Sequence, residues 1–334
     1  MRRQRILWVL KLCTGITLLS LLLFTADLRE VADQFRTVDP GWLVAMLIVP
    51  HLGILLSTIK WHALLRCQGS SVGMGVLLRL YLVGTFFNNF LPTMIGGDIV
   101  RAQQLRHSEP RTHLVIASTF LERFIGFGGL ISLLPLACLH PVLREELPAA
   151  GYAALLAMAA YTAVTVLLVS PIALLPSFDP RVRLLRRVLD ALRKAQRQVW
   201  SYREHRGVLV WSYVLSLVFY VAAALTVWLG TRAVGASVSI AFLLAATPVV
   251  LLAATVPISV NGLGILESGY VLVLTLVSVP IEQAATVALL LRVRILLTAI
   301  LGGVLFILLR NRRSSPDEAA APTLAETPHA RDAS

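Results

Sequence analysis

The fold of this chain is decided by residues 88–101, which read NNFLPTMIGGDIVR. This stretch places two amides, a proline, a glycine pair, an aspartate and an arginine between long apolar segments. Non-helical backbone and unsolvated charge are tolerated at membrane depth only where protein or a water-filled cavity surrounds them. We therefore expect a broken helix here that marks a site, and a surrounding chain that serves as its scaffold.

The composition is that of a membrane protein. Hydrophobic residues make up 57% of the chain and charged residues 14%, whereas about a quarter of the residues in soluble domains are charged. The apolar residues form blocks of about 18 or more largely uncharged positions, which are typical of membrane-spanning helices. The blocks lie at 6–25, 42–61, 75–91, 113–138, 151–175, 208–230, 239–257, 264–280 and 283–309. The predicted fold class is an all-α polytopic membrane protein with about 7–9 hydrophobic helices.

The net charge of +12 does not indicate a nucleic-acid partner. The arginines cluster at the ends of apolar blocks, as the positive-inside rule expects, and no nucleic-acid-binding motif accompanies them. The three cysteines, Cys13, Cys67 and Cys138, fall in no pairing or metal-binding spacing. We therefore expect no metal site and no cofactor.

Basic residues also predict the topology. The segment 176–207 is the most basic part of the chain, and the chain start and the end of the last apolar block are basic too, so all three should be cytoplasmic. We expect one transmembrane unit over residues 1–310, which includes a basic amphipathic helix at 181–206. Residues 311–334, rich in alanine, proline and charge, should form a disordered cytoplasmic tail.

The first broken segment is expected to be a re-entrant hairpin. Because the second block ends in the cytoplasm and the fourth and fifth blocks carry the chain out and back, the segment 67–112 must begin and end on the cytoplasmic side. The return leg from Pro92 to Arg106 is too short and too polar for an ordinary span. The third block should therefore enter the membrane and turn back.

A second break predicts an inverted repeat. Residues 256–267 read VPISVNGLGILE. Each break has a proline, a glycine five positions later (Gly97 and Gly262) and then a charged residue (Arg101 and Glu267). Inverted repeats with broken helices that meet near the membrane midplane are a recurring transporter design. Charge parity also allows three full crossings in the second half, so both arrangements remain open there.

The first break carries a candidate anion site. Its loop can expose backbone N–H groups, and the helix that follows offers the positive end of its dipole, which together suit a phosphate or a carboxylate. Arg101 lies one turn beyond Asp98 and can bind an anionic headgroup or pair with that aspartate. The alternative is a glycine-mediated packing turn with a structural Asp98–Arg101 pair.

Other ionisable residues interrupt apolar blocks and have two readings each. Glu122 and Arg123 point about 100° apart on a helix and should serve different partners. In one interpretation both face a cavity, where Arg123 binds an anion and Glu122 balances charge or takes up a proton. In the other they belong to a buried structural network. Glu267 can serve a site or simply start a helix. Of Arg292 and Arg294, Arg292 is expected to reach the cavity, and the alternative for one of the two is to extend only toward the interface. The predicted substrate-binding residues are Asn88, Asn89, Pro92, Gly96, Gly97, Asp98, Arg101, Glu122, Arg123, Pro257, Asn261, Gly262, Gly264, Glu267 and Arg292.

Two motifs of nucleotide binding and metal-dependent hydrolysis are absent from the sequence, G-x-x-x-x-G-K-[ST] and H-E-x-x-H. We therefore expect no catalytic residues and a protein that is not an enzyme, and ATP-driven transport by this chain alone is not predicted.

These motifs in combination resemble the membrane region of bacterial lysylphosphatidylglycerol synthase/flippases. The resemblance extends to about Arg313 and rests on 89–92 (NFLP), 96–98 (GGD), Arg101, 122–123 (ER), Pro257, 262–264 (GLG), Glu267 and the Lys60-Trp61 pair. It implies movement of a lipid between leaflets. The soluble aminoacyl-transfer domain of the synthases has no counterpart in the sequence, so we expect a stand-alone member and do not carry aminoacylation over.

The function predicted is a flippase or scramblase of the bacterial inner membrane, with both termini cytoplasmic. Its substrate would be an anionic, aminoacylated or polyprenyl-linked lipid, bound through Arg101 and Arg123, while Asp98, Glu122 and Glu267 balance charge or couple protons. The alternative is an accessory membrane subunit that partners a lipid-modifying or glycosyl-transferring enzyme. A third reading, an enzyme acting on a lipid phosphate, lacks a visible catalytic set. The sequence does not indicate an oligomeric state.

Overall fold

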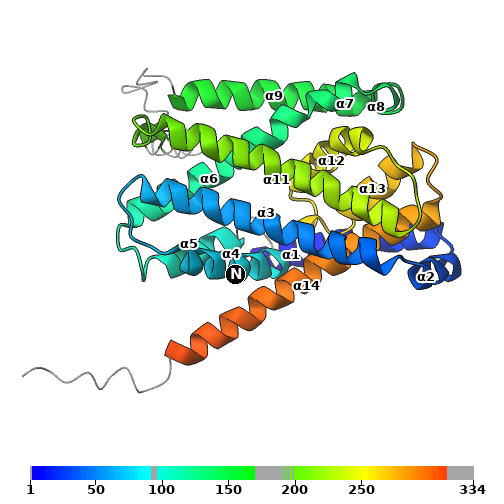
Figure 1. Cartoon of the computed structure of the whole chain (residues 1–334), viewed down its shortest axis with the longest axis horizontal. Helices are drawn as coiled ribbons and strands as arrows, with labels where there is room; N and C mark the ends of the chain where they lie inside the picture. Colours follow the sequence, from blue (N-terminus) through cyan, green and yellow to red (C-terminus); the bar gives the residue numbers. More distant parts are fainter. Residues whose placement is uncertain are drawn as a thin grey trace, which may run out of the picture.

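The computed structural model describes residues 2–91, 96–169, 190, 193, 196–197 and 199–313. Every regular element in this described part is helical (Figure 1). The elements are α1 (Arg2–Thr25), α2 (Leu28–Arg36), α3 (Pro40–Arg66), α4 (Met74–Phe90), α5 (Gly96–Leu105), α6 (Thr112–Leu133), α7 (Pro135–Leu139), α8 (Pro141–Glu146), α9 (Pro148–Val169), α11 (Arg206–Ala233), α12 (Ile240–Thr255), η1 (Val260–Gly262), α13 (Ile265–Thr275) and α14 (Ile281–Arg313).

Five stretches of the described chain are long and apolar enough to cross a membrane. They are Pro40–Arg66, Thr112–Leu139, Pro148–Val169, Arg206–Ala233 and Ile281–Leu308. A sixth candidate is the pair α1 and α2, which is bent by 86° at its break. Each of the nine apolar blocks coincides with one of these helices or with a shorter apolar helix, so the predicted all-α polytopic membrane fold is confirmed.

The short helices α2, α7 and α8 were not predicted from the pattern of apolar blocks. Helix α2 begins where the Asp27 side chain accepts from the backbone N–H of Arg29 at 2.8 Å. In the same way, Asp39 caps α3 by accepting from Gly41 and Trp42. An aspartate at this position satisfies backbone donors that a helix start leaves unpaired. Capping of this kind stabilises the short helix α2, whereas α7 and α8 each begin at a proline, whose fixed φ suits the first helical position.

The described chain contains two halves with the same order of elements, α3 to α6 and α11 to α14. Gly69 after α3 and Gly235 after α11, 166 positions apart, both have φ +76°. The backbone N–H of each glycine donates to the carbonyl three residues earlier, and the N–H of the next residue donates to the carbonyl five residues earlier. The two helices therefore end in the same glycine cap.

The two halves run in opposite directions. The backbone N–H of Asp39, at the start of α3, donates to the carbonyl of Ala233, at the end of α11. At the other end of the pair, the Tyr202 hydroxyl, just before α11, donates to the Leu64 carbonyl near the end of α3. The colours in Figure 1 show the same antiparallel course of α3 and α11. The repeat is therefore inverted, as the two breaks predicted.

Each half contains a helical hairpin that is too short to span a membrane. Helix α5 has 10 residues and α13 has 11, which at 1.5 Å per residue reach roughly half the hydrocarbon thickness. Helix α5 folds back against α4 at Gly84 and Gly97, where a β-carbon on Gly97 would overlap the Gly84 carbonyl oxygen. The first break thus forms the predicted hairpin, and α12 with α13 forms its counterpart, where Gly269 faces Val250.

The register of the two hairpins differs from the sequence prediction. Matching the prolines paired Arg101 with Glu267, but the structure places Asp98 and Glu267 in equivalent first turns, because α5 begins at Gly96 and α13 at Ile265. The second break is longer and contains the single turn η1. Extra residues in one break shift the register after it, which a comparison of short motifs cannot detect.

Apolar side chains also cover the outside of the long helices. Leu155 and Leu156 on α9 and Ile300 and Ile307 on α14 are more than half exposed. Exposed apolar surface of this extent is unfavourable in water and matches a lipid surround. The predicted amphipathic helix 181–206 falls mostly outside the described residues, and so does the predicted tail from residue 314 onward.

Candidate functional site

Asp98 ties the first hairpin to the helix that follows it. The carboxylate lies in the first turn of α5, with Oδ1 3.0 Å from Arg101 Nε. Arg123 on α6 donates to the same group twice, from Nε to Oδ2 at 2.6 Å and from Nη2 to Oδ1 at 2.9 Å. Asp98 is buried, whereas the side chain of Arg123 is 44% exposed. This two-point contact fixes α5 against α6.

Glu122 collects a second set of partners. Arg101 donates from Nη2 to Oε2 at 2.6 Å, and the Lys60 ammonium lies 3.1 Å from Oε1. The Tyr81 hydroxyl donates to Oε1 at 3.2 Å. Glu122 and Arg123 therefore serve different partners, as their spacing on a helix predicts. The contacts join α3, α4, α5 and α6 through one carboxylate.

The Arg101 guanidinium is enclosed by aromatic rings. It lies 4.5 Å from the ring centroids of both Trp61 and Tyr81, and the residue is 2% exposed. Trp61 donates to the Ser118 hydroxyl at 3.2 Å. Lys60 and Trp61 follow a long apolar segment, as interfacial anchors of a membrane helix do, but both are buried in this cluster. Cation–π contact and two carboxylates stabilise a charge that burial alone would disfavour.

This cluster is best described as a structural network. Lys60, Arg101 and Arg123 face Asp98 and Glu122, so each cation has a carboxylate partner. A headgroup phosphate at Arg101 would have to displace partners at 2.6 and 3.0 Å in a closed environment. Of the two readings left open by the sequence, the geometry favours the buried network.

Glu267 plays the corresponding part in the second hairpin. Its Oε2 accepts from the backbone N–H of Gly264 at 2.7 Å and so caps α13. Its Oε1 accepts from Nε of Arg292 on α14, and Arg292 also donates to the Gly262 carbonyl at 3.3 Å. Glu267 is therefore both a helix-start residue and a buried ion-pair partner.

The two hairpins are fastened in the same way. In each, an acid in the first turn after the break pairs with an arginine on the next helix, and both pairs, Asp98–Arg123 and Glu267–Arg292, are separated by 25 residues. Each carboxylate also occupies the N-terminal end of its helix, where the dipole favours negative charge. A ligand anion would meet repulsion at both helix ends, so these ends are poor phosphate sites.

The tips of the hairpins touch each other. Asn261 donates from Nδ2 to Oδ1 of Asn89 at 2.6 Å. Asn89 in turn donates to the Thr85 carbonyl, and Asn88 accepts from the N–H of Gly97 at 2.8 Å. The amides thus supply polar partners at the break of α4, and the Asn261–Asn89 bond links the tips of the two hairpins, beside the packing of α3 on α11 and of α4 on α14.

The second break requires left-handed backbone. Asn261 has φ 48°, Gly262 φ 66° and Gly264 φ 78°. Asparagine and glycine adopt this region at the lowest cost, which explains these residue types.

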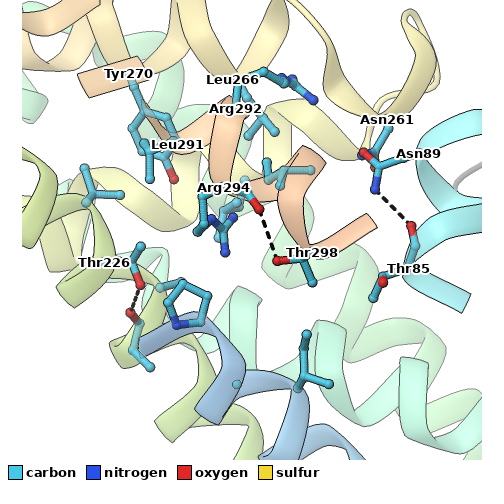
Figure 2. A pocket seen from close by; sticks show the side chains of 18 of the residues that line it. Thr85, Asn89, Thr226, Asn261, Leu266, Tyr270, Leu291, Arg292, Arg294 and Thr298 are labelled. Atoms are coloured by element: carbon cyan, nitrogen blue, oxygen red, sulfur yellow. Dashed lines mark hydrogen bonds between the residues drawn. The ribbon is translucent and has the colours of Figure 1, made fainter. Parts of the chain in front are cut away.

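A cavity of about 360 Å³ lies between the two halves (Figure 2). Its wall is mostly apolar and is formed by α3, α4, α11, both helices of the second hairpin and α14. The predicted site residues Asn88, Asn89, Asn261, Glu267 and Arg292 line it. This is the place where the polar residues of both breaks face one shared space.

Arg294 also lines this cavity and was not predicted as a site residue. Figure 2 shows its side chain directed into the pocket. Its Nε is buried without a hydrogen-bond partner, and no carboxylate within 4.0 Å of it is found in the described part of the chain. The prediction chose Arg292 for the cavity and left Arg294 out; the structure places both on its wall and gives the carboxylate partner to Arg292.

The other predicted site residues lie apart from the cavity. Asp98, Arg101, Glu122 and Arg123 form the separate network, and Gly96 and Gly97 pack the first hairpin. Pro257 is exposed at the second break, and Pro92 lies outside the described residues. Sequence reasoning missed Tyr81, whose position inside an apolar block gave no signal. Within the described chain, no group of three or more His, Cys, Asp or Glu side chains could hold a metal ion.

Comparison with known proteins places the chain in a family. Residues 8–303 match the family model described as the lysylphosphatidylglycerol synthase TM region. A UPF0104 membrane protein of Methanothermobacter thermautotrophicus is 24% identical over 294 residues, which cover 82% of this chain and 87% of that protein. The matched region includes both hairpins, both ion-pair sets and the cavity. The chain therefore belongs to the lysylphosphatidylglycerol synthase transmembrane-region family.

Proposed function

We propose that this protein moves a membrane lipid from one leaflet to the other as a flippase or scramblase. The observation that carries the proposal is the contact of two oppositely directed hairpins at Asn89 and Asn261, on the wall of a cavity shared by both halves. Broken helices of inverted repeats that meet at a central site are the arrangement on which alternating access is built. The family membership supports a role in lipid membranes.

The cavity suits a headgroup better than a whole lipid. A volume of about 360 Å³ is near the lower end of small-molecule sites, roughly 300–1,000 Å³. The acyl chains would stay in the surrounding lipid, against the apolar outer faces of the long helices. The protein would thus need to shield only the polar part of its substrate from hydrocarbon, which is the part that makes unassisted crossing slow.

The ion networks would hold the hairpins while the halves move. Each hairpin is fastened to the next helix of its own half, through Asp98–Arg123 and Glu267–Arg292. The contact between the halves at the tips is a single hydrogen bond between neutral amides. Such a contact breaks at far lower cost than a buried ion pair. Rocking of one half against the other would therefore open the tip contact first.

The orientation we propose places both termini in the cytoplasm of a cell membrane. Arg66 at the end of α3 and Arg106 and Arg111 around the α5–α6 connection lie at one end of the first half. The positive-inside rule assigns this end to the cytoplasm. The first hairpin then enters from the cytoplasmic side and the second from the outside.

The proposal is tested by reconstitution. Purified protein in liposomes with an acyl-chain-labelled fluorescent phosphatidylglycerol is treated with dithionite, which bleaches only the accessible leaflet. Transport predicts bleaching well beyond the half seen in empty liposomes. In Ala223→Leu, a larger side chain fills part of the cavity wall and should slow bleaching, whereas Ala153→Leu on the exposed face of α9 should not.

Bleaching equal to that of empty liposomes, with phosphatidylglycerol and with zwitterionic, aminoacylated and polyprenyl-phosphate lipids, would contradict the proposal. The alternative function, an accessory subunit of a lipid-modifying or glycosyl-transferring system, then becomes the next to test. Its test is recovery of an enzyme partner when the full chain is purified in mild detergent.

A further inference from the structure

We propose that Arg294 is the headgroup-binding residue and that the cavity takes a lipid phosphodiester with one net negative charge. The inference rests on the proposed function and names the substrate class at the same cavity. It moves the phosphate contact from Arg101 and Arg123, where the sequence placed it, to a residue that had no assigned role.

The arginines of the two halves differ in their partners. Arg101, Arg123 and Arg292 all contact carboxylates at ion-pair distance. Arg294, which is partly buried, contacts none in the part of the chain that the structure describes, and its Nε has no hydrogen-bond partner. Nε and Nη1 of Arg101 also lack hydrogen bonds, but Arg101 has two carboxylates at ion-pair distance. A guanidinium in a mostly apolar cavity is costly unless an anion or several acceptors compensate it. A ligand anion supplies that compensation.

The charge of the cavity also favours an anion. The lining residues that are charged at neutral pH are Glu267, Arg292 and Arg294. Glu267 and Arg292 neutralise each other, so one positive charge remains. A phosphodiester carries one negative charge, and its two free oxygens match the fork of a guanidinium. The match in charge number favours a phosphodiester over a phosphomonoester, which carries more charge than the cavity can neutralise.

Two threonines in the cavity wall are oriented as acceptors. Thr226 and Thr298 already donate their hydroxyl protons to the carbonyls of Ala222 and Arg294, so their oxygens face the cavity as acceptors. Acceptors of this kind suit hydroxyl groups on a headgroup and do not compete for its phosphate. Arg294 remains the strong donor for an anion.

The same electrostatics disfavour an aminoacylated headgroup. A lysyl ester adds two ammonium groups to the phosphate and gives the headgroup a net positive charge. The cavity with its surplus positive charge would repel it, whereas a glycerol headgroup adds no charge. Among the lipid classes considered above, unmodified anionic phospholipid is therefore preferred.

Binding is measured directly, without transport. Titration calorimetry of the detergent-purified protein uses short-chain phosphatidylglycerol, with short-chain phosphatidylcholine, lysyl-phosphatidylglycerol and inorganic phosphate as comparison ligands. Arg294→Gln is expected to weaken phosphatidylglycerol binding about tenfold or more, the effect of one lost charged contact. Arg294→Lys should restore part of the affinity, and Arg79→Gln on the exposed face of α4 should leave it unchanged.

Thermal melting without lipid distinguishes a structural role of Arg294 from a ligand-binding role. If Arg294 is an uncompensated charge awaiting a ligand, Arg294→Gln melts at the same or a higher temperature than the wild type. Equal phosphatidylglycerol affinity in wild type and Arg294→Gln overturns the inference, and so does tighter binding of lysyl-phosphatidylglycerol. Equal affinity for inorganic phosphate and the lipid would show an anion site that does not recognise lipid, which also overturns it.

Failure of the inference and failure of the proposed function give different results. Arg294-dependent binding without leaflet exchange keeps the site and removes the transport function. Leaflet exchange and binding that both survive Arg294→Gln keep the transport function and remove the site.

Discussion

Asn261 donates a hydrogen bond to Asn89 at 2.6 Å across 172 residues of sequence, and this bond joins the tips of the two hairpins. The two asparagines belong to the two inverted halves, so their contact is the point at which the halves meet beside the cavity. Both are neutral, whereas the contacts that hold each hairpin to its own half are ionic.

The tip contact is predicted to be a single coupled interaction. Asn89→Ala should destabilise the protein by about 1 kcal/mol, because one partly buried hydrogen bond is lost. Asn261→Gly should cost about the same, since glycine accepts the φ of 48° at that position without strain. The double variant should cost little more than either single one, as measured by chemical unfolding in detergent. Fully additive losses would show that the two side chains do not interact in solution.

Removing one partner of the Glu267–Arg292 pair is predicted to destabilise the protein more than removing both. Glu267→Gln or Arg292→Gln alone leaves a buried charge without its partner, which costs about 3–5 kcal/mol. The double variant removes both charges and keeps an acceptor for the Gly264 N–H, so it should be more stable than either single variant. Thermal melting of the four proteins tests this order. A double variant that is the least stable of the four would contradict it.

The matched control for that experiment is the equivalent pair in the first hairpin. Arg123→Gln should cost less than Arg292→Gln, because Arg123 is 44% exposed and Asp98 keeps Arg101 as a second cation. The same series of melting curves provides this comparison.

Gly97 is predicted to tolerate no side chain. Its β-carbon would overlap the Gly84 carbonyl oxygen, which belongs to a helix backbone and cannot move aside. Gly97→Ala should separate α5 from α4 and cost about 3 kcal/mol or more. Gly75→Ala is the control, because nothing lies within 4 Å of a β-carbon there. The two variants are compared by yield and melting temperature, and equal behaviour would mean that the hairpin is not packed as described.

A pH dependence is predicted at the connection between α5 and α6. The Arg111 guanidinium donates to both carboxylate oxygens of Glu109 and to the carbonyls of Gln68 and Gly69. Hydrogen bonds from the Arg111 side chain lower the pKa of Glu109 from its ordinary 4.5 to about 2. The folded state thus holds the charged form more strongly, so this stabilisation is complete above pH 4.5 and is lost as the pH falls toward 2.

Glu109→Gln provides the measurement. The variant should melt below the wild type at pH 7, and the difference should shrink between pH 4.5 and pH 2. A difference that stays constant over this range would assign the contribution of Glu109 to packing and not to its charge.

The sequence allowed much of the fold to be predicted, because its signals were long. Nine apolar blocks and the distribution of arginines carry enough information to place the helices and the first hairpin. The inverted repeat was predicted from two prolines and two glycines, but its register was wrong after the break, since Asp98 and not Arg101 corresponds to Glu267.

The site was less predictable, because it depends on which side chains meet. Arg292 and Arg294 have the same surroundings in sequence, and only their three-dimensional partners distinguish them. Lys60 and Trp61 lie near a helix end and have the composition of an interfacial anchor, yet the packing of α3 against α4, α6 and α11 buries both. Long-range pairing of this kind leaves no local pattern to read.

The most direct test is a reversible lock on the tip contact. Cysteines replace Asn89 and Asn261 in a protein whose native Cys13, Cys67 and Cys138 have been changed to serine. A short bis-thiosulfonate reagent then bridges them in the liposome assay with fluorescent phosphatidylglycerol. We predict that leaflet exchange stops on bridging and returns on reduction, while each single-cysteine protein is unaffected by the reagent. Exchange at the same rate in the bridged protein would contradict the claim that the lipid crosses where the two hairpins meet.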